Sequence, residues 1–183
     1  EANPRPEVVA FSIGGPETDY LRNSFRAVYE CARHLGLRTT AHAGETSGPE
    51  AIWEAIQNLK VDRIAHGIHA PKDPQLMEYL KKHRIPLDVC PTSNLKLGYF
   101  SSYKKHPIRL FVDEGIPVTL NSDDPALFNQ DLVEEYEILL QKGLFTAREL
   151  KKIAGESFKQ AFMAEELKEP YLSKLSDYPE NPD

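Results

Sequence analysis

Several features are scarce in this sequence of 183 residues, and each scarcity argues against a class of protein. Its two cysteines, Cys31 and Cys90, are too few for a disulfide framework and favour a reducing cytoplasm. Acidic residues outnumber basic ones, 28 to 22, and no run of Lys or Arg exceeds two, which argues against a nucleic-acid or membrane surface. There is no apolar stretch long enough to span a bilayer and no signal-peptide pattern. The remaining composition, 40% hydrophobic and 27% charged, is ordinary for a globular protein.

Strand-like apolar runs alternate with amphipathic segments along the chain. We expect five strands, over residues 8–13, 37–41, 63–65, 86–89 and 118–120. We expect helices over 20–35, over about a dozen residues from Pro49, from Pro74, over 107–114, and in two or three further segments before a disordered tail at 177–183. This alternation predicts a parallel sheet with right-handed crossovers.

The sheet could be a doubly wound open sheet or part of a TIM (β/α)8 barrel. Residues capable of chemistry follow all five expected strands, as in barrel active sites. An open sheet usually has one Gly-rich phosphate loop, and the sequence after Gly14-Gly15-Pro16 does not continue as one. We therefore expect an α/β TIM barrel of which about five C-terminal β/α units are present, with residues 1–176 as part of a single domain. Since the chain begins with Glu1 rather than Met, we expect a fragment whose three remaining strands lie elsewhere.

The segment from His42 to Glu45 places an imidazole and a carboxylate three positions apart where a strand ends. A neutral imidazole is a good zinc ligand, and a glutamate beside zinc can move protons. Gly44 allows the sharp turn that would let both side chains reach one cavity. The alternative interpretation is a helix-capping loop with a buried, hydrogen-bonded histidine.

Two later strand ends supply matching groups. His66 occupies the equivalent position one β/α unit after His42. Asp123 and Asp124 follow the last strand, and two adjacent carboxylates repel each other unless a cation or ligand offsets the repulsion. Taken alone, His66 could be structural and Asp124-Pro125 could simply start a turn or helix. Together these groups form a set suited to metal-assisted hydrolysis.

The remaining candidates have simpler explanations. No helix N-terminus or cation is evident beside Cys90, so we expect a small buried thiol that shapes its loop. His34 and His83 lie in the last turns of expected helices, and we place His69 on a loop surface. Trp53, at helical spacing from core positions, is expected in the core.

Four segments, in order and spacing, resemble the strand-end motifs of adenosine deaminases. They are Thr40-Ala41-His42-Ala43-Gly44-Glu45, Arg63-Ile64-Ala65-His66-Gly67, Cys90-Pro91-Thr92-Ser93-Asn94 and Asn121-Ser122-Asp123-Asp124-Pro125. The resemblance extends from about Val8 to Glu166. It implies a (β/α)8 enzyme with one Zn²⁺ per active site that hydrolyses the 6-amino group of a purine, converting adenosine and water to inosine and ammonia.

The resemblance also implies individual roles. His42 and Asp123 would bind zinc, while His66 would orient and deprotonate the zinc-bound water. Glu45 would protonate purine N1 and must therefore start protonated, which a desolvated pocket favours. Asp124 would form a hydrogen bond at purine N7, and the backbone of Gly15 would contact N3.

The sequence departs from the family pattern at two points. Pro16 stands where the family usually has Asp, and the chain contains no His-x-His motif, which in the family supplies two more zinc ligands from the first strand. We therefore expect the N-terminal half of the barrel, upstream or on a companion chain, to complete the site. The isolated chain is then expected to be inactive and to bind zinc weakly.

Three alternatives remain open at this stage. Adenine or aminodeoxyfutalosine could be the substrate on the same scaffold, or the chain could be a non-catalytic half-barrel that serves as an interaction module. The base-flipping zinc deaminases are excluded because they use P-C-x-x-C, and the Cys-Pro here has no second Cys nearby. The expected partner is a small purine nucleoside or base, with no nucleic acid and no membrane.

Overall fold

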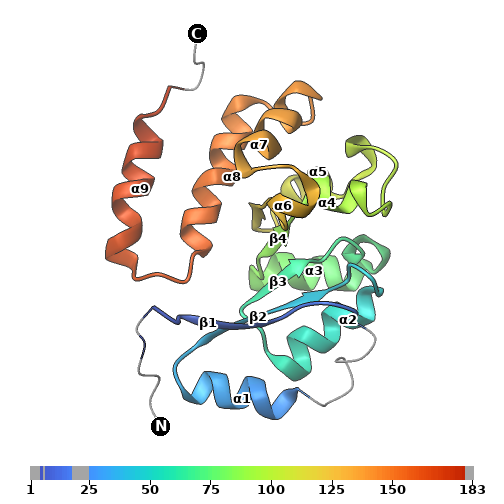
Figure 1. The fold of residues 1–183 in the computed structure, drawn as a ribbon, viewed down its shortest axis with the longest axis vertical. Helices are drawn as coiled ribbons and strands as arrows, with labels where there is room; N and C mark the ends of the chain where they lie inside the picture. Colours follow the sequence, from blue (N-terminus) through green and yellow to red (C-terminus); the bar gives the residue numbers. More distant parts are fainter. Residues whose placement is uncertain (1–4, 6, 18–24, 180–183) are drawn as a thin grey trace. The chain divides into compact units, whose positions relative to one another are not determined.

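The computed structural model describes residues 5, 7–17 and 25–179, and its strands form one parallel sheet. The strands are β1 (Ala10–Ile13), β2 (Arg38–Ala43), β3 (Arg63–His66), β4 (Leu87–Val89) and β5 (Val118–Leu120), in the order β1-β2-β3-β4-β5 (Figure 1). Their sequential order has no reversal point of the kind that defines a doubly wound sheet. The predicted parallel sheet with alternating helices is confirmed, and the order fits part of a barrel.

The chain divides into two compact units, residues 1–88 and 89–183. A single domain over 1–176 therefore stays a prediction. The first unit contains α1 (Arg26–His34), α2 (Pro49–Glu54) with its π-helical continuation Ala55–Leu59, the short 3-10 helix Ala70–Lys72, and α3 (Pro74–His83). The part of the helix expected over 20–35 that falls on residues 20–24 lies outside the described residues.

In the first unit, α1 and α2 lie along one face of β1 and β2 (Figure 1). The fully buried Tyr29 of α1 packs edge-on against Phe11 of β1, with ring centroids 5.2 Å apart. Its hydroxyl donates to the carbonyl of Thr40 on β2 at 2.8 Å. The apolar face of α1 and this polar contact thus fix the helix against the strand that carries His42.

A side-chain cap starts α3. Asp73 accepts hydrogen bonds from the backbone N–H groups of Gln75 and Leu76, and Pro74 occupies the first helical position. The second carboxylate oxygen of Asp73 accepts from the indole of Trp53 at 2.8 Å. Trp53 is therefore half-buried with its polar edge engaged, rather than a core residue as expected from its spacing.

The second unit is mostly helical apart from β5. Its helices are α4 (Pro91–Lys96), the 3-10 helix Tyr103–Lys105, α5 (Ile108–Asp113), α6 (Pro125–Phe128), α7 (Leu132–Gln141), α8 (Ala147–Gln160) and α9 (Glu165–Asp177). α7 and α8 each begin with a capping box, built on Asp131 and Thr146. α8 packs on β5, and α9 lies beside α8 (Figure 1).

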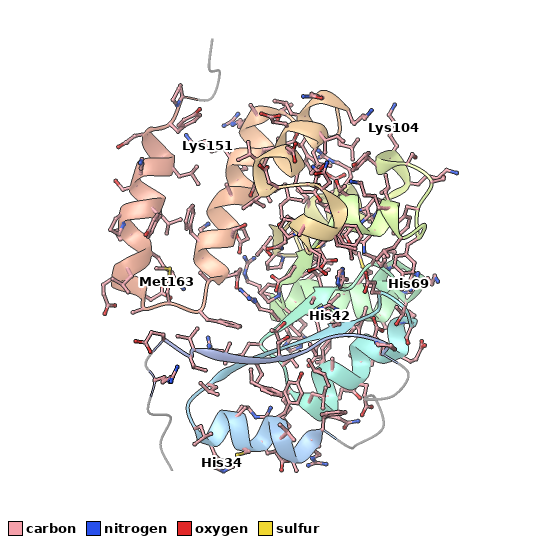
Figure 2. The ribbon with its side chains drawn as sticks, viewed as in Figure 1. His34, His42, His69, Lys104, Lys151 and Met163 are labelled. Atoms are coloured by element: carbon pink, nitrogen blue, oxygen red, sulfur yellow. The ribbon has the colours of Figure 1, made fainter. Side chains whose placement is uncertain are left out.

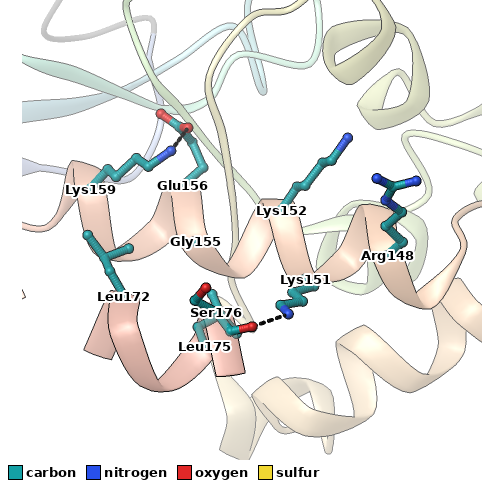
Figure 3. Close-up of a pocket in the computed structure, with 9 residues that line it drawn as sticks. All are labelled: Arg148, Lys151, Lys152, Gly155, Glu156, Lys159, Leu172, Leu175 and Ser176. Carbon is teal, nitrogen blue, oxygen red and sulfur yellow. Dashed lines mark hydrogen bonds and ion pairs between the residues drawn. The ribbon is translucent and has the colours of Figure 1, made fainter. Parts of the chain in front are cut away.

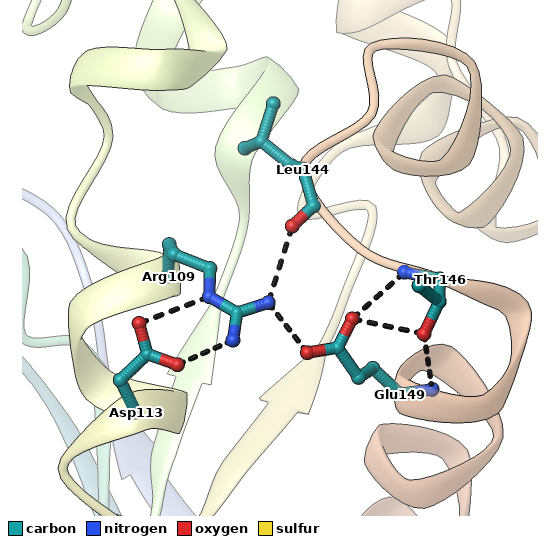
Figure 4. Close-up of polar contacts among 5 residues, drawn as sticks. All are labelled: Arg109, Asp113, Leu144, Thr146 and Glu149. Carbon is teal, nitrogen blue, oxygen red and sulfur yellow. Dashed lines mark hydrogen bonds and ion pairs between the residues drawn. The ribbon is translucent and has the colours of Figure 1, made fainter.

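An ion-pair network joins α5 to α8. Arg109 of α5 contacts Asp113 on its own helix, the carbonyl of Leu144, and Glu149 of α8 (Figure 4). Glu149 is also the capping-box acid that pairs with Thr146, so one carboxylate both caps its helix and binds the guanidinium. Thr146 and Arg109 together lower the pKa of Glu149 to about 2.

One sequence expectation needs correction in the second unit. The segment after Cys90 was expected to be a loop without a helix N-terminus, but Cys90 is the N-cap residue of α4. Pro91 suits the first turn of a helix, which is the signal that was missed. The expected burial of the thiol is confirmed, since Cys90 is 5% exposed.

At the C-terminus, the expected tail begins at Asp177, the last residue of α9, and its residues 180–183 lie outside those described. Over the described ranges, no helix combines the length and hydropathy needed to cross a membrane.

Candidate active site

β2 presents His42 on one face while it buries the other. Its residues alternate in burial, so Ala41 and Ala43 are fully buried and His42 between them is half-buried on the opposite side. The imidazole of His42 lies edge-on to that of His66, with ring centroids 4.8 Å apart. Figure 2 shows His42 at the sheet, whereas the exposed His34 lies on α1.

His66, the last residue of β3, has an unusual backbone conformation. Five described residues other than glycine have positive φ: Lys60, His66, Arg84, Asp123 and Asn129. Lys60, Arg84 and Asn129 are C-cap residues of helices, where this conformation is common. His66 (φ 69°) instead ends a strand and Asp123 (φ 61°) follows one, and strain of this kind clusters at functional sites.

Glu45 completes a cluster with the two histidines. One oxygen of its carboxylate lies 3.5 Å from Nδ1 of His66, and one potential metal-ligating atom from each of His42, Glu45 and His66 lies within 4.8 Å of the others. Glu45 is 7% exposed and His66 is 1% exposed. The structure thus brings together three residues that sequence reasoning had placed in one site.

Glycines give this cluster its shape. A Cβ atom on Gly14 would lie 3.1 Å from Nε2 of His42, so glycine lets the backbone after β1 approach that nitrogen closely. Gly15, expected at the purine, has φ 100°, a conformation that favours glycine. Gly44 has φ 71°, and a Cβ there would lie 2.5 Å from Cδ1 of Ile52. The role of Gly15 at the purine stays a prediction.

The two aspartates expected in the site belong to the second unit. Asp123 is exposed and accepts a hydrogen bond from the hydroxyl of Ser93 on α4 at 2.6 Å. Asp124 is the exposed N-cap residue of α6, and its side chain makes no cap hydrogen bond. Their predicted roles, Asp123 at the metal and Asp124 at purine N7, stay predictions.

A buried acid, Glu135, holds the start of α4, the helix that carries Ser93. Ser93 lies in α4 next to Thr92, whose backbone N–H and hydroxyl both donate to the carboxylate of Glu135, at 3.0 and 2.8 Å. Glu135 belongs to α7 and is fully buried, and burial raises its pKa although both bonds to Thr92 oppose the rise. Within the second unit, Glu135 therefore anchors the start of the helix that supplies the hydrogen bond to Asp123.

Sequence reasoning missed Glu17. It follows the Gly-Gly-Pro segment after β1, is fully buried, and accepts hydrogen bonds from the backbone N–H groups of residues 44–47. Nothing in its sequence context distinguishes it from an exposed acid. His106 was also missed as a buried residue: its Nδ1 accepts from the N–H of Ile108, and its Nε2 faces the side chain of Asn94 at 3.2 Å.

A pocket between α8 and α9, about 480 Å³ in volume, contains none of the expected site residues. Two of its basic residues have partners: Lys151 donates to the carbonyl of Ser176, and Lys159 pairs with Glu156 at 3.8 Å (Figure 3). The expected site therefore lies elsewhere, at the strand ends.

Solved structures share this fold. Adenine deaminase from Arthrobacter aurescens superposes with a TM-score of 0.89 at 31% identity and covers 92% of this chain and 52% of its own. An amidohydrolase from Burkholderia ambifaria with bound Zn superposes with a TM-score of 0.84 at 28% identity, covering 96% of this chain and 51% of its own. The expected partial TIM barrel is thereby confirmed.

Curated proteins are similar in sequence. The aminodeoxyfutalosine deaminase of Streptomyces avermitilis is 42% identical over 160 residues, 87% of this chain and 45% of that protein. The adenosine deaminase of Shewanella denitrificans is 39% identical over 161 residues, 88% of this chain and 49% of that protein. The chain thus spans about half the length of the curated relatives it matches. The family model for adenosine deaminase matches residues 2–178, and the chain therefore belongs to the adenosine deaminase family.

Proposed function

We propose that the protein containing this chain is a zinc-dependent hydrolase that removes the 6-amino group of a purine, with adenosine as its substrate. The observation that carries the proposal is the cluster of half-buried His42 with buried Glu45 and His66, at the ends of neighbouring strands, in a chain of this family. Imidazole and carboxylate groups confined within 4.8 Å have the chemistry that a hydrolytic deaminase needs.

The donor set fits zinc. His42 offers an imidazole and Asp123 a carboxylate, both ligand types that Zn²⁺ accepts, and a structural neighbour has bound Zn. His42 and Asp123 would hold the ion, with further ligands from a part of the protein outside this chain. When bound, zinc makes a water molecule nucleophilic near neutral pH.

The remaining chemistry belongs to side chains of this chain. His66 accepts a proton from the attacking water, whose oxygen bonds to purine C6, while Glu45 donates a proton to ring nitrogen N1. The amino group then takes the proton held by His66, the C6–N bond breaks and ammonia leaves, while the proton of the C6 hydroxyl passes to the Glu45 carboxylate as the C6 carbonyl of inosine forms. Asp124 forms a hydrogen bond at N7, and the backbone of Gly15 contacts N3. The burial of Glu45 and His66 excludes bulk water from these transfers.

Aminodeoxyfutalosine is a second candidate substrate. It is favoured by the 42% identity to the aminodeoxyfutalosine deaminase of Streptomyces avermitilis, compared with 39% to an adenosine deaminase. The reaction at C6 would be the same, and only contacts on the sugar side would differ. Initial rates with adenosine, adenine and aminodeoxyfutalosine, measured on the native protein, would rank the three.

The other half of the barrel is part of the proposal. We infer that the strands outside this chain, on the same polypeptide or on a companion chain, complete the metal site, and that the enzyme acts in the cytoplasm. The isolated 183-residue chain is then inactive and binds zinc weakly. Stoichiometric, tight zinc binding by the isolated chain in a titration would contradict this part.

The variant Glu45→Gln tests the role of the carboxylate. It should retain zinc but lose turnover by at least about 10²-fold, because only proton transfer is removed. Zinc content and kcat of the native protein and variant are the measurements. Glu50→Gln is the matched control, an exposed glutamate in the first turn of α2 that should leave kcat unchanged. Near-normal turnover in Glu45→Gln would show that another group protonates the purine.

A further inference from the structure

The carboxylate of Glu17 is held by four consecutive backbone N–H groups. One oxygen accepts from Gly44 at 2.8 Å and Ser47 at 3.2 Å, and the other accepts from Glu45 at 2.7 Å and Thr46 at 3.0 Å. The connection is reciprocal, since the backbone N–H of Glu17 donates to the hydroxyl of Thr46 at 3.3 Å. Two segments separated by 27 to 30 residues are thereby joined.

Burying a carboxylate destabilises the folded state unless its oxygens accept hydrogen bonds. Glu17 is fully buried, and the converging N–H groups form an anion-binding concavity. The left-handed conformation of Gly44 turns the chain so that these groups can face one point. The N–H groups of the loop 44–47 are therefore paired with the acid after β1 rather than in strand or helix bonds. On the carbonyl side, the backbone N–H of His69 donates to Gly44 at 3.0 Å, and its ring Nδ1 lies 2.7 Å from the carbonyl of Ser47.

This loop carries the proposed proton donor. The backbone N–H of Glu45 makes the shortest of the four bonds, and the N–H groups before and after it are held by the same carboxylate. The backbone from which the Glu45 side chain extends is thus fixed, and that side chain lies 3.5 Å from His66. A displacement of about 1 Å in such a group can cost about 10²-fold in rate.

The geometry points to Glu17 as the positioning residue for Glu45: its buried carboxylate fixes the loop 44–47 so that the Glu45 carboxyl is aimed beside His66. This inference rests on the proposed function, since it assigns a catalytic consequence to the anchor. Glu17 itself would touch neither substrate nor metal.

The test is Glu17→Gln in the native protein. The amide keeps one accepting oxygen and replaces the other with a donor, so two of the four N–H groups lose their partner. We expect kcat to fall between about tenfold and 10²-fold with KM within about threefold, because orientation rather than substrate binding is lost. Glu50→Gln is the control, because exposed Glu50 accepts a single loop N–H, from Gly48, and should leave kcat unchanged.

A double-mutant cycle separates positioning from general stability. If Glu17 acts through Glu45, then Glu17→Gln should lower kcat by less than about twofold in the Glu45→Gln background. A purely structural role would reduce the active fraction equally in both backgrounds. An equal fall in both would overturn the inference.

Hydrogen exchange gives a readout that is independent of activity. In the unmodified protein, the amides of residues 44–47 should be protected, and in Glu17→Gln they should exchange at least about tenfold faster while those of β2 stay unchanged. If the variant does not fold, the unmodified protein decides: exchange of these amides at the rate of an unstructured peptide would overturn the inference. Unchanged kcat in a folded Glu17→Gln would do the same. Absence of deaminase activity in the unmodified protein would instead defeat the proposed function, and this inference with it.

Discussion

Replacing Gly44 with alanine should destabilise the first unit through two separable effects. The residue has φ 71°, which an L side chain adopts at a cost of about 1 kcal/mol. The new Cβ would also lie 2.5 Å from Cδ1 and 2.6 Å from Cγ1 of Ile52, closer than van der Waals contact allows. Ile52 is fully buried on α2, so moving its side chain aside would displace other core atoms.

The magnitude follows from adding these effects. Forced overpacking in a filled core costs about 1–3 kcal/mol, so Gly44→Ala should lower the free energy of unfolding by about 2–4 kcal/mol. Gly36 provides the matched control, because it has φ 77° and a Cβ there would have no neighbour within 4 Å. Gly36→Ala should therefore cost only the conformational part, about 1 kcal/mol.

Urea unfolding followed by fluorescence is a suitable assay, since Trp53 is the only tryptophan and lies next to Ile52 on α2. In the Ile52→Ala background the colliding atoms are gone, so the added cost of Gly44→Ala should fall to about 1 kcal/mol, the Gly36→Ala value. Equal losses for Gly44→Ala and Gly36→Ala in the unmodified background would refute the steric reasoning.

Two further predictions concern buried and paired carboxylates in the second unit. Thr146 and Arg109 lower the pKa of Glu149 from 4.5 to about 2, so these contacts stabilise the fold fully above the unfolded value and are lost as pH falls through the folded one. The stability difference between the unmodified chain and Glu149→Gln should therefore shrink between about pH 4.5 and 2 in urea unfolding; a constant difference would contradict this. Thr92→Val removes one donor from Glu135, whose pKa is already raised by burial, and should cost about 1–3 kcal/mol at neutral pH. Because burial raises the folded pKa of Glu135, its contribution to stability is greatest at low pH and falls as pH rises through that pKa. The hydroxyl of Thr92 favours the charged carboxylate, so the loss caused by Thr92→Val should be smaller at pH 4, where the carboxyl is protonated. A loss that grew on acidification would refute this.

Local sequence carried much of the fold. Apolar runs ending in polar groups located the strands, and Pro49 and Pro74 stand at the first positions of α2 and α3 as predicted. These signals succeed because they depend on neighbouring residues alone. The same pattern put His42 and His66 at adjacent strand ends, where a parallel register brings their rings within 4.8 Å.

Signals from neighbouring residues in the sequence can also mislead. The helix that follows Cys90 was missed, although Pro91 at its first turn was available as a cue. Trp53 was expected in the core, yet its indole donates to Asp73, which belongs to the next helical unit. For Trp53 the deciding partner lies 20 positions away, outside the short window that hydrophobic spacing examines.

The sequence by itself determined where the strands lie along the chain and which histidine and carboxylate groups stand at their ends. Both follow from backbone propensity and side-chain alternation, which are local properties. Only the tertiary structure decided that Glu17 and Glu135 are buried. A carboxylate is ordinarily exposed, and whether it can be buried depends on donors from distant parts of the chain. For Glu17 those donors lie 27 to 30 positions away, and for Glu135 they lie 43 positions away. Folding alone creates the concavities that hold these charges, and with them the fixed loop from which Glu45 extends.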